Sequence, residues 1–324
     1  MMTSRPSLNS HVSNFWSPLM SFRTVLLSSL CSAASVGVLV VAATLTPTAA
    51  FAQKAFPTAE AAANAFIDAV ATNDDAAKRV ILGADYRRFI PPESVDADDR
   101  TAFLYASSKG RKIIADGPEM AHLSVGTEGW TLPVPIVKTA QGWSFDAKGG
   151  AEEMRIRRIG RNELAAMQAL LAYYDAQKDY ALADRNGDGV LEYAQRFAST
   201  PGKRDGLFWP NDPASPLGPL YGDETKDGVF HGYRFRILKA QGPDARGGAR
   251  DFVVKGRMTQ GFAAVAWPAK YDYTGIMTFI VSHDGNVYQK NLGAGTDSAA
   301  RAMKAFNPDK TWTQVPDSTL IPKP

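Results

Sequence analysis

The spacing of hydrophobic residues changes along the chain and predicts a helical part followed by strands. Between residues 56 and 110, apolar residues recur every three or four positions, which is typical of helices with one buried face. Thr58 is expected to cap the first helix, Gly83 to end the second and Asp96 to cap the third. From residue 111 to residue 148 the apolar positions form short runs and alternations, which predict strands. Helices followed by a small antiparallel sheet indicate an α+β domain.

A helical period returns in the middle of the chain. The apolar residues with this spacing are Leu164, Met167, Leu171 and Tyr174 before a polar loop, and Leu191, Ala194 and Phe197 after it. Asn162 is expected to cap the first helix, and Pro201-Gly202 to end the second. The pattern predicts a central helix-loop-helix over residues 151–200.

The last third reads as a connection followed by a β-rich part. Residues 201–228 are rich in proline and glycine, which predicts a loop, and the apolar residues within 207–221 are expected to pack as an ordered strap that also offers a binding surface. Alternation over 233–237 and apolar runs at 262–267 and 276–281 predict strands. Asp284-Gly285 predicts a hairpin turn, and Thr296 is expected to cap a short helix.

The first 52 residues have the features of an export signal. Arg23 precedes an apolar, small-residue run, and Ala50-Phe51-Ala52 matches a cleavage site, which predicts a cut after Ala52. Translation from Met20 would give a signal of more ordinary length. A retained membrane anchor is the alternative, but the run is rich in Ala, Ser and Thr. We therefore expect a periplasmic or secreted protein that is not an integral membrane protein after cleavage.

These patterns predict five segments. They are a signal peptide at 1–52, an α+β domain at 53–150, a helix-loop-helix at 151–200, a Pro/Gly-rich strap at 201–228 and an antiparallel β-rich domain at 229–324.

Composition excludes several kinds of chemistry. The only cysteine, Cys31, lies within the signal segment, so the remaining chain has no disulfide, thiol nucleophile or thiolate metal site. The chain has 36 basic and 33 acidic residues, and two of the arginines precede residue 53. A nearly neutral chain argues against nucleic acid as a partner.

One polar loop carries the spacing of a calcium ligand set. Asp184, Asn186 and Asp188 take positions one, three and five of an EF-hand-like loop, and Gly189 takes position six. Val190 would offer its carbonyl oxygen, and Glu192 its carboxylate, at positions seven and nine. Calcium prefers such oxygen ligands, supplied from alternate positions.

The last position of this loop departs from the pattern. Position twelve is Gln195, whose single neutral oxygen replaces a bidentate carboxylate, so binding is expected to be weak. Leu191 is expected to turn toward the core. The alternative is a metal-free turn, because Asn-Gly and Asp-Gly pairs both favour turns. A single loop of this kind favours structural calcium over sensing.

Catalytic motifs are scarce. His122, His231 and His283 have no zinc-ligand spacing, and the chain has no serine-hydrolase elbow. His231 precedes a strand and follows an acidic loop, so it is the candidate general base if the protein is an enzyme, with a structural loop histidine as the alternative. His283, beside the predicted hairpin turn, is expected to be exposed.

Two resemblances add to this interpretation. The first helix around Ala65-Phe66 and the strand pair around Trp130 and Trp143–Asp146 resemble the nuclear-transport-factor-like fold, which often encloses a pocket. The chain from residue 53 resembles the bacterial domain of unknown function 2950 family, which implies a Gram-negative cell-envelope setting and no known activity. The tracts that carry this resemblance are residues 157–163, 184–189, 213–220, 231–233, 267–271 and 275–285.

The interpretation with most support is an exported binding or scaffolding protein with one structural calcium loop and an unknown envelope protein or polymer as partner. A hydrolase acting on an envelope polymer, using His231, is one alternative. A small-ligand carrier with a pocket in the N-terminal domain is the other.

Overall fold

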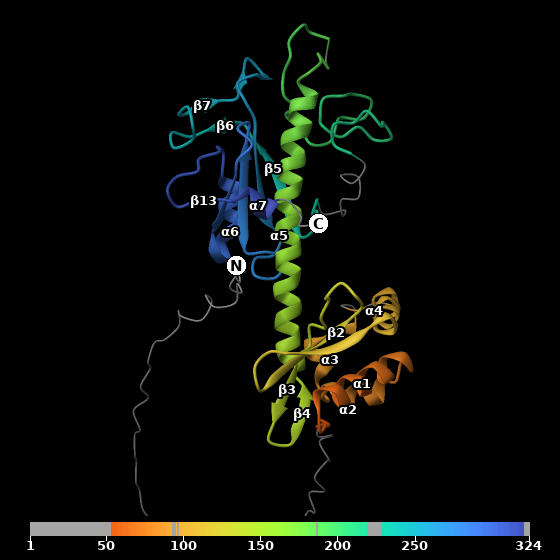
Figure 1. The fold of residues 1–324 in the computed structure, drawn as a ribbon. Helices are drawn as coiled ribbons and strands as arrows, with labels where there is room; N and C mark the ends of the chain where they lie inside the picture. Colours follow the sequence, from red (N-terminus) through yellow and green to blue (C-terminus); the bar gives the residue numbers. More distant parts are fainter. Residues whose placement is uncertain (1–52, 93–94, 96, 186, 219–227, 321–324) are drawn as a thin grey trace, which may run out of the picture. The chain divides into compact units, whose positions relative to one another are not determined.

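The protein has an α+β fold whose two larger sheets lie in different parts of the sequence. The structure, a computed structural model, describes residues 53–92, 95, 97–185, 187–218 and 228–320. Helices and a small antiparallel sheet come first, a long helix follows, and a second antiparallel sheet comes last (Figure 1). The predicted signal segment 1–52 and the predicted cap Asp96 lie outside the described residues. The order of the elements confirms the predicted α+β class.

Short helices with side-chain caps begin the described chain. Thr58 accepts a hydrogen bond from the Ala61 amide at 3.1 Å, and Asp74 caps the next helix in the same way. Gly83 follows that helix with a φ of +98°, a conformation that favours glycine, so the predicted end is confirmed. The helices are α1 (Ala59–Ala71), α2 (Asp75–Leu82), α3 (Tyr86–Phe89) and α4 (Ala97–Lys109).

The first sheet packs against α1. Its strands pair antiparallel in chain order, and they are β1 (Arg111–Ala115), β2 (Met120–Val125), β3 (Ile136–Thr139) and β4 (Gly142–Phe145). The ring of Phe66 on α1 lies 5.2 Å from that of Phe145 on β4, and 5.8 Å from that of Phe103 on α4. Such tilted and edge-on pairs are favoured ring arrangements. These rings fill space in which the carrier interpretation places a pocket.

The long helix α5 (Ala147–Tyr180) begins much earlier than the sequence pattern predicts. The Asp146 carboxylate caps it by accepting a hydrogen bond from the Gly149 amide at 2.9 Å. Asn162 therefore lies inside the helix, and its predicted role as N-cap is wrong. The helix also runs through residue 150, where the sequence pattern places a domain boundary.

The spacing of apolar residues does not predict the first half of α5, because ion pairs and not an apolar stripe support it. Glu152 pairs with Arg155 at 2.6 Å, and Glu153 pairs with Arg157 at 2.7 Å, both within one helical turn. Charged pairs at this spacing stabilise a helix without producing an apolar period.

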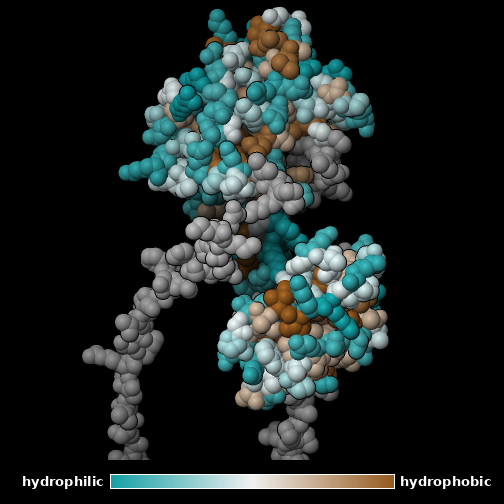
Figure 2. Space-filling model, in the orientation of Figure 1, coloured by the Kyte–Doolittle hydropathy of each residue, from teal (hydrophilic) through white to brown (hydrophobic). Residues whose placement is uncertain are grey.

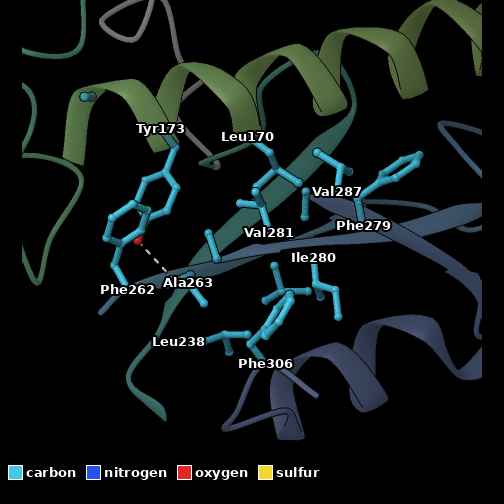
Figure 3. Packing of buried hydrophobic residues seen from close by; sticks show 14 of the residues in the cluster. Leu170, Tyr173, Leu238, Phe262, Ala263, Phe279, Ile280, Val281, Val287 and Phe306 are labelled. Atoms are coloured by element: carbon cyan, nitrogen blue, oxygen red, sulfur yellow. Dashed lines mark hydrogen bonds between the residues drawn. The ribbon is translucent and has the colours of Figure 1, made fainter. Parts of the chain in front are cut away.

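The second sheet forms the main core together with α5. Its order is β13-β12-β11-β10-β5, with every neighbouring pair antiparallel. Every residue of β10 is buried. Figure 3 shows α5 over one face, where the Tyr173 hydroxyl donates to the Ala263 carbonyl at 3.1 Å. The strands are β5 (Tyr233–Leu238), β10 (Ala263–Pro268), β11 (Met277–Ser282), β12 (Val287–Asn291) and β13 (Thr313–Gln314).

Smaller elements complete this part. The Asp284-Gly285 turn joins β11 to β12, as predicted, with Gly285 at a φ of +79°. Thr296 is the first residue of α6 (Thr296–Ala302), and its hydroxyl donates to the Gly293 carbonyl, so its predicted role as cap is wrong. The remaining elements are β6 (Ala240–Gln241), β7 (Arg250–Asp251), β8 (Val253–Val254), β9 (Arg257–Met258), the 3-10 helix η3 (Gly293–Gly295) and α7 (Asp317–Leu320).

The predicted strap packs into the same core. Leu207, Trp209 and Leu217 are buried, and the Trp209 indole donates to the Gly206 carbonyl at 2.7 Å. Residues 219–227 lie outside the described part. In its described part the strap contributes these apolar side chains to the core and does not expose them. Figure 2 shows a mostly hydrophilic face, on which hydrophobic residues form small separate groups.

The predicted second helix of the central helix-loop-helix does not form. The Gln177 side chain accepts a hydrogen bond from the Ala194 amide and donates one to the Ala194 carbonyl, each at 2.8 Å. The Tyr193 amide donates to the Met258 carbonyl at 2.8 Å. These partners occupy backbone groups that a helix would need, and Leu191 is 57% exposed, contrary to its predicted burial.

No helix within the described ranges combines the length and the apolar character that crossing a membrane requires.

Candidate functional site

The loop that follows α5 is organised by one carboxylate. Asp184 Oδ1 accepts hydrogen bonds from the amides of Gly187 and Asp188, at 2.8 and 3.3 Å. Asp184 Oδ2 accepts one from the Gly189 amide at 2.7 Å. Gly187 and Gly189 have φ values of +76° and +81°, which other residues rarely adopt. The two glycines allow the chain to turn closely around the Asp184 side chain.

Two further acidic residues lie near this turn. Asp188 Oδ1 accepts from the Val190 amide at 3.0 Å, and Asp188 Oδ2 lies 2.8 Å from the Arg257 guanidinium. Burial raises the pKa of Glu192, and the negative charges of Asp188 and Asp184 raise it further. The charges of Asp188 and Asp184 therefore act on Glu192, and Arg257 offsets part of that effect.

The remaining predicted calcium ligands include Asn186 and Gln195. Asn186 lies outside the described residues. The Gln195 amide oxygen accepts from Lys239 Nζ at 3.1 Å, and its nitrogen donates to the Gly256 carbonyl at 2.7 Å, so the side chain is engaged by other residues. In the described part of the chain, no three His, Cys, Asp or Glu side chains group as potential metal ligands. A calcium ion here would need Asn186, carbonyl oxygens such as that of Val190, and displacement of Arg257 from Asp188.

His231, the candidate general base, is exposed at the turn before β5. Its φ is +46°, and its ring packs edge-on against Phe230 with the ring centroids 4.3 Å apart. Asp223 and Glu224, the acidic residues expected near it, lie outside the described residues. No carboxylate among the described residues forms an ion pair with His231, so its assignment as a base stays a prediction.

A cavity of about 330 Å³ lies where the β6–β7 connection meets the end of β11. Gln241, Ser282 and Phe306, which are all buried, are part of its lining. Arg246, Arg250, His283 and Asp284 complete the polar lining with side chains that are partly or fully exposed. Its volume is at the lower end of the range for ligand sites, about 300–1,000 Å³.

His283 is half-buried in this lining, so its predicted exposure is wrong. Arg250 Nη2 lies 2.7 Å from His283 Nε2. A guanidinium only donates hydrogen bonds, so Nε2 is the acceptor and the imidazole is neutral, with its proton on Nδ1. Burial, together with the charge of Arg250, lowers the pKa of His283, which favours the same neutral form.

The sequence contains little signal for this cavity. Arg250 and His283 are 33 residues apart, and they meet only because the β6–β7 hairpin lies beside the β11–β12 turn. Gly261 lets the chain pass close to His283, since a Cβ at this position would lie 2.9 Å from Nδ1. Its φ of +133° is also one that other residues rarely adopt. No local motif encodes such an arrangement.

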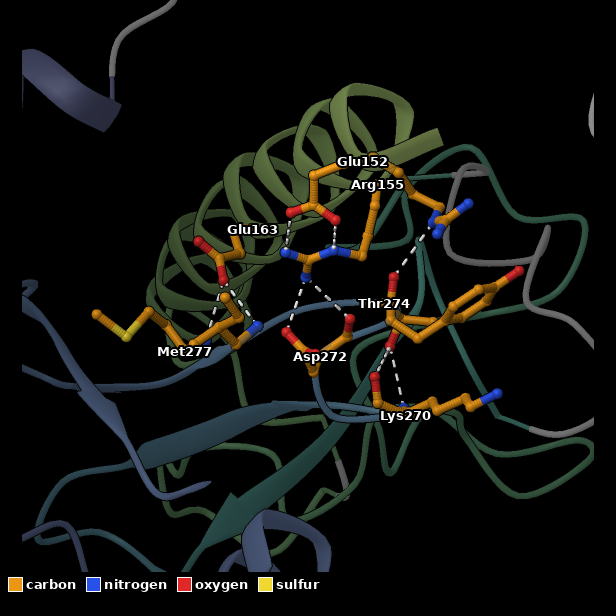
Figure 4. Close-up of polar contacts among 10 residues, drawn as sticks. Glu152, Arg155, Glu163, Lys270, Asp272, Thr274 and Met277 are labelled. Atoms are coloured by element: carbon orange, nitrogen blue, oxygen red, sulfur yellow. Dashed lines mark hydrogen bonds and ion pairs between the residues drawn. The ribbon is translucent and has the colours of Figure 1, made fainter. Parts of the chain in front are cut away.

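A separate group of polar contacts attaches α5 to the turn before β11 (Figure 4). Arg155 pairs with Asp272 at 2.7 Å. The Asn162 amide donates to the Thr274 carbonyl at 2.8 Å. Glu163 accepts hydrogen bonds from the amides of Ile276 and Met277, at 2.9 and 3.0 Å. These contacts replace the missing apolar stripe in fixing this half of the helix.

A comparison with protein families shows the family to which the chain belongs. A family model described as a protein of unknown function, DUF2950, matches residues 53–315. The chain belongs to the DUF2950 family. No curated protein and no solved structure matches it. The likeness of the N-terminal part to the nuclear-transport-factor-like fold stays a prediction.

The fold brings together three of the tracts that carry the DUF2950 resemblance. Asn162, from the first tract, lies against Gly232, from another, because a Cβ on Gly232 would come 2.7 Å from the Asn162 amide nitrogen. Gly275, from a third, lies against Tyr233, whose hydroxyl donates to the Met277 carbonyl at 2.9 Å. In this DUF2950 chain these tracts form a packed junction between α5 and the second sheet, which is a structural role.

Proposed function

We propose that this DUF2950 protein is exported to the cell envelope, acts there by binding or scaffolding without catalysis, and holds one structural calcium ion in the Asp184–Gln195 loop. Its partner is an envelope protein or polymer. The nearly balanced charge of the chain argues against nucleic acid.

The single observation that carries the calcium proposal is the arrangement of Asp184. Its carboxylate organises three successive amides and lies near Asp188 and Glu192, at the place where the EF-hand-like spacing puts the ion. A divalent cation would relieve the repulsion that, in addition to burial, raises the pKa of Glu192. The Gln177 contacts with Ala194 fix the end of the loop to the core, which favours a structural role over a sensing one.

A substitution of Arg257 tests this proposal by raising the calcium affinity, whereas substitutions of the ligands lower it. Its guanidinium occupies Asp188 Oδ2, so it competes with any cation that uses the same oxygen. Removing the guanidinium is expected to strengthen calcium binding, whereas removing Asp184 and Asp188 is expected to abolish it.

The experiment is thermal unfolding of the purified protein in excess EGTA and in 1 mM calcium. A site with a dissociation constant of about 0.1 mM would stabilise the native state by about 1.4 kcal/mol at this concentration. For a protein of this size that corresponds to a rise in Tm of about 2–4 °C. The rise should be lost in Asp184→Ala/Asp188→Ala and should occur at lower calcium concentrations in Arg257→Gln.

A matched control removes the same number of carboxylates elsewhere. Glu119→Ala/Glu128→Ala changes two exposed acidic residues and should keep the full calcium-dependent rise. No rise in the unaltered protein up to 10 mM calcium, or an equal rise in the Asp184→Ala/Asp188→Ala variant, would reduce the loop to a turn.

Export has a separate test. The mass of the mature protein recovered from the periplasm or medium should correspond to a chain that begins at Gln53. A chain that keeps residues 1–52 and sediments with membranes would support the anchor alternative. The exposed position of His231 against Phe230 does not favour the hydrolase alternative.

A further inference from the structure

We propose that the cavity lined by Arg246, Arg250 and His283 binds a small ligand through an oxyanion, the phosphate or carboxylate group of that ligand. The inference adds a small ligand to the proposed envelope partner, and it uses no residue of the calcium loop. Its basis is the charge, hydrogen bonding and size of the cavity.

The charge of the lining favours an anion. Within the described residues, neither Arg246 nor Arg250 has a carboxylate oxygen within 4.0 Å. The only carboxylate in the lining, Asp284, uses Oδ1 to accept hydrogen bonds from the Ser282 hydroxyl and the Asn286 amide, at 2.8 and 3.2 Å. Asp284 is therefore held by its own turn, while the two guanidiniums keep donors for a ligand. A planar guanidinium binds carboxylate and phosphate through two parallel hydrogen bonds.

His283 positions one of these guanidiniums. The neutral ring accepts a hydrogen bond from Arg250 Nη2, and the ring is itself held by the close approach of Gly261 and by edge-on packing against Phe252. Arg250 also lies over the ring of Phe252, with 5.9 Å between the guanidinium carbon and the ring centroid. A guanidinium held in one orientation loses less conformational entropy when it binds a ligand.

The part of the lining around Gln241 is also held in place. The Gln241 amide donates to the carbonyls of Arg246 and Gly248, at 2.9 and 2.6 Å, which fixes the turn that carries Arg246. Gln241 is 3% exposed and Ser282 is 1% exposed, so polar groups reach the interior of the cavity. Together with the Phe306 ring, these groups give the cavity a mixed polar and apolar lining, which suits a ligand that combines one anionic group with hydroxyl and apolar surface.

The test is isothermal titration of the purified protein with inorganic phosphate, glucose 6-phosphate, glucuronate and glucose. We expect saturable binding of one or both sugar anions and none of neutral glucose. The phosphate and carboxylate arms decide which oxyanion the cavity prefers. Inorganic phosphate shows whether the anion alone suffices.

Variants assign any binding to the cavity. Arg250→Gln should weaken binding about ten- to hundredfold, as expected for the loss of a charge-assisted hydrogen bond. Arg250→Lys keeps the charge without the planar fork and should lose part of the affinity. Arg246→Gln should also weaken binding, and Arg111→Gln, at an exposed arginine on β1, should leave it unchanged.

Each result has a defined meaning. Absence of binding of all three anions at 10 mM overturns the inference. It is also overturned if Arg250→Gln and Arg246→Gln bind the anions with the affinity of the parent protein while their unfolding curves match that of the parent. The calcium-dependent rise in Tm is measured on the same samples. If that rise is present without anion binding, this inference alone fails, and if anion binding is present without the rise, the calcium proposal alone fails.

Discussion

The Asp184–Gln195 loop and the Arg250–His283 cavity are two polar regions that are built in opposite ways. The loop is one continuous segment, in which a carboxylate binds amides three to five residues further along the chain. The cavity draws its lining from residues 241–250, 282–284 and 306. The loop carries negative charge on an exposed turn, and the cavity carries positive charge on the exposed Arg246 and Arg250.

The difference shows what each region depends on. Short-range hydrogen bonds shape the loop, so its conformation should survive changes elsewhere in the protein. The cavity exists only while the β6–β7 hairpin, the β11–β12 turn and Gly261 keep their relative positions. Substitutions in the core should therefore disturb the cavity more than the turn around Asp184.

The largest expected effect comes from Gln177, which joins the end of the loop to the core. Gln177→Met would leave the buried amide and carbonyl of Ala194 without their partners, at a cost of about 2–4 kcal/mol in the free energy of unfolding. Urea unfolding measures this change. Gln141→Met, at an exposed turn, is the control and should stay within about 0.5 kcal/mol of the parent. A loss below about 1 kcal/mol for Gln177→Met would show that the end of the loop is not fixed by this residue.

The second largest effect should come from the wall of the cavity. In Gly261→Ala, the added Cβ would lie 2.9 Å from both His283 Nδ1 and a Phe252 ring carbon, at a φ of +133°. We expect a loss of about 1–3 kcal/mol in stability and weaker binding of the sugar anions. Gly256→Ala places an alanine at another positive φ, +82°, with no atom within 4 Å of the added Cβ, so it shows backbone strain without the contact. Equal anion affinity in the two variants would contradict the role assigned to His283.

The contrast between local and long-range contacts also explains which parts of the fold the sequence predicts. The α+β order, the Asp284-Gly285 hairpin and the Thr58 cap depend on local patterns, and the structure confirms them. The sequence pattern does not predict the early start of α5, because ion pairs, which leave no apolar period, support its first half. The prediction of a second central helix is wrong because Gln177, which lies on α5, forms hydrogen bonds with the Ala194 amide and carbonyl that a helix would use.

The two functional regions follow the same rule. The loop was recognised from the spacing of Asp184, Asp188 and Gly189, which are neighbours in the chain. The cavity was missed because Arg250 and His283 become neighbours only in the fold. His283 was misjudged since its burial comes from Gly261 and Phe252, which are distant in sequence.

A smaller effect separates the turn from the metal site. In EGTA, Asp184→Ala should cost about 1 kcal/mol, because it removes the acceptor for three exposed amides. Asp184→Asn keeps an oxygen acceptor and should cost less in EGTA, while still reducing the calcium-dependent rise in Tm through the loss of charge. Thermal unfolding of both variants, with and without calcium, measures the two contributions. An undiminished calcium response in both would place any bound ion elsewhere.

The smallest effect concerns pH and the cavity. The pKa of His283 is lowered in the folded protein, by burial first and by Arg250 second, so below the ordinary value of about 6.5 the unfolded chain binds more protons than the native one. The contribution to stability is therefore fully present above this pH and is lost as the pH falls toward the folded pKa. Because the ring is only half-buried, we expect a difference below about 1 kcal/mol between pH 7.5 and pH 5.5.

Urea unfolding of the parent and of His283→Asn over this pH range measures the contribution, since other titrating groups are common to both proteins. Saturating glucose 6-phosphate should reduce the pH dependence in the parent, because a bound anion offsets the charge of Arg250 and restores part of the proton affinity of His283. Asp284, the remaining charged group beside the ring, is unchanged in both proteins. If the two proteins lose stability in parallel as the pH falls, His283 is not held neutral by Arg250, and the cavity would then present its arginines without the fixed orientation on which anion binding depends.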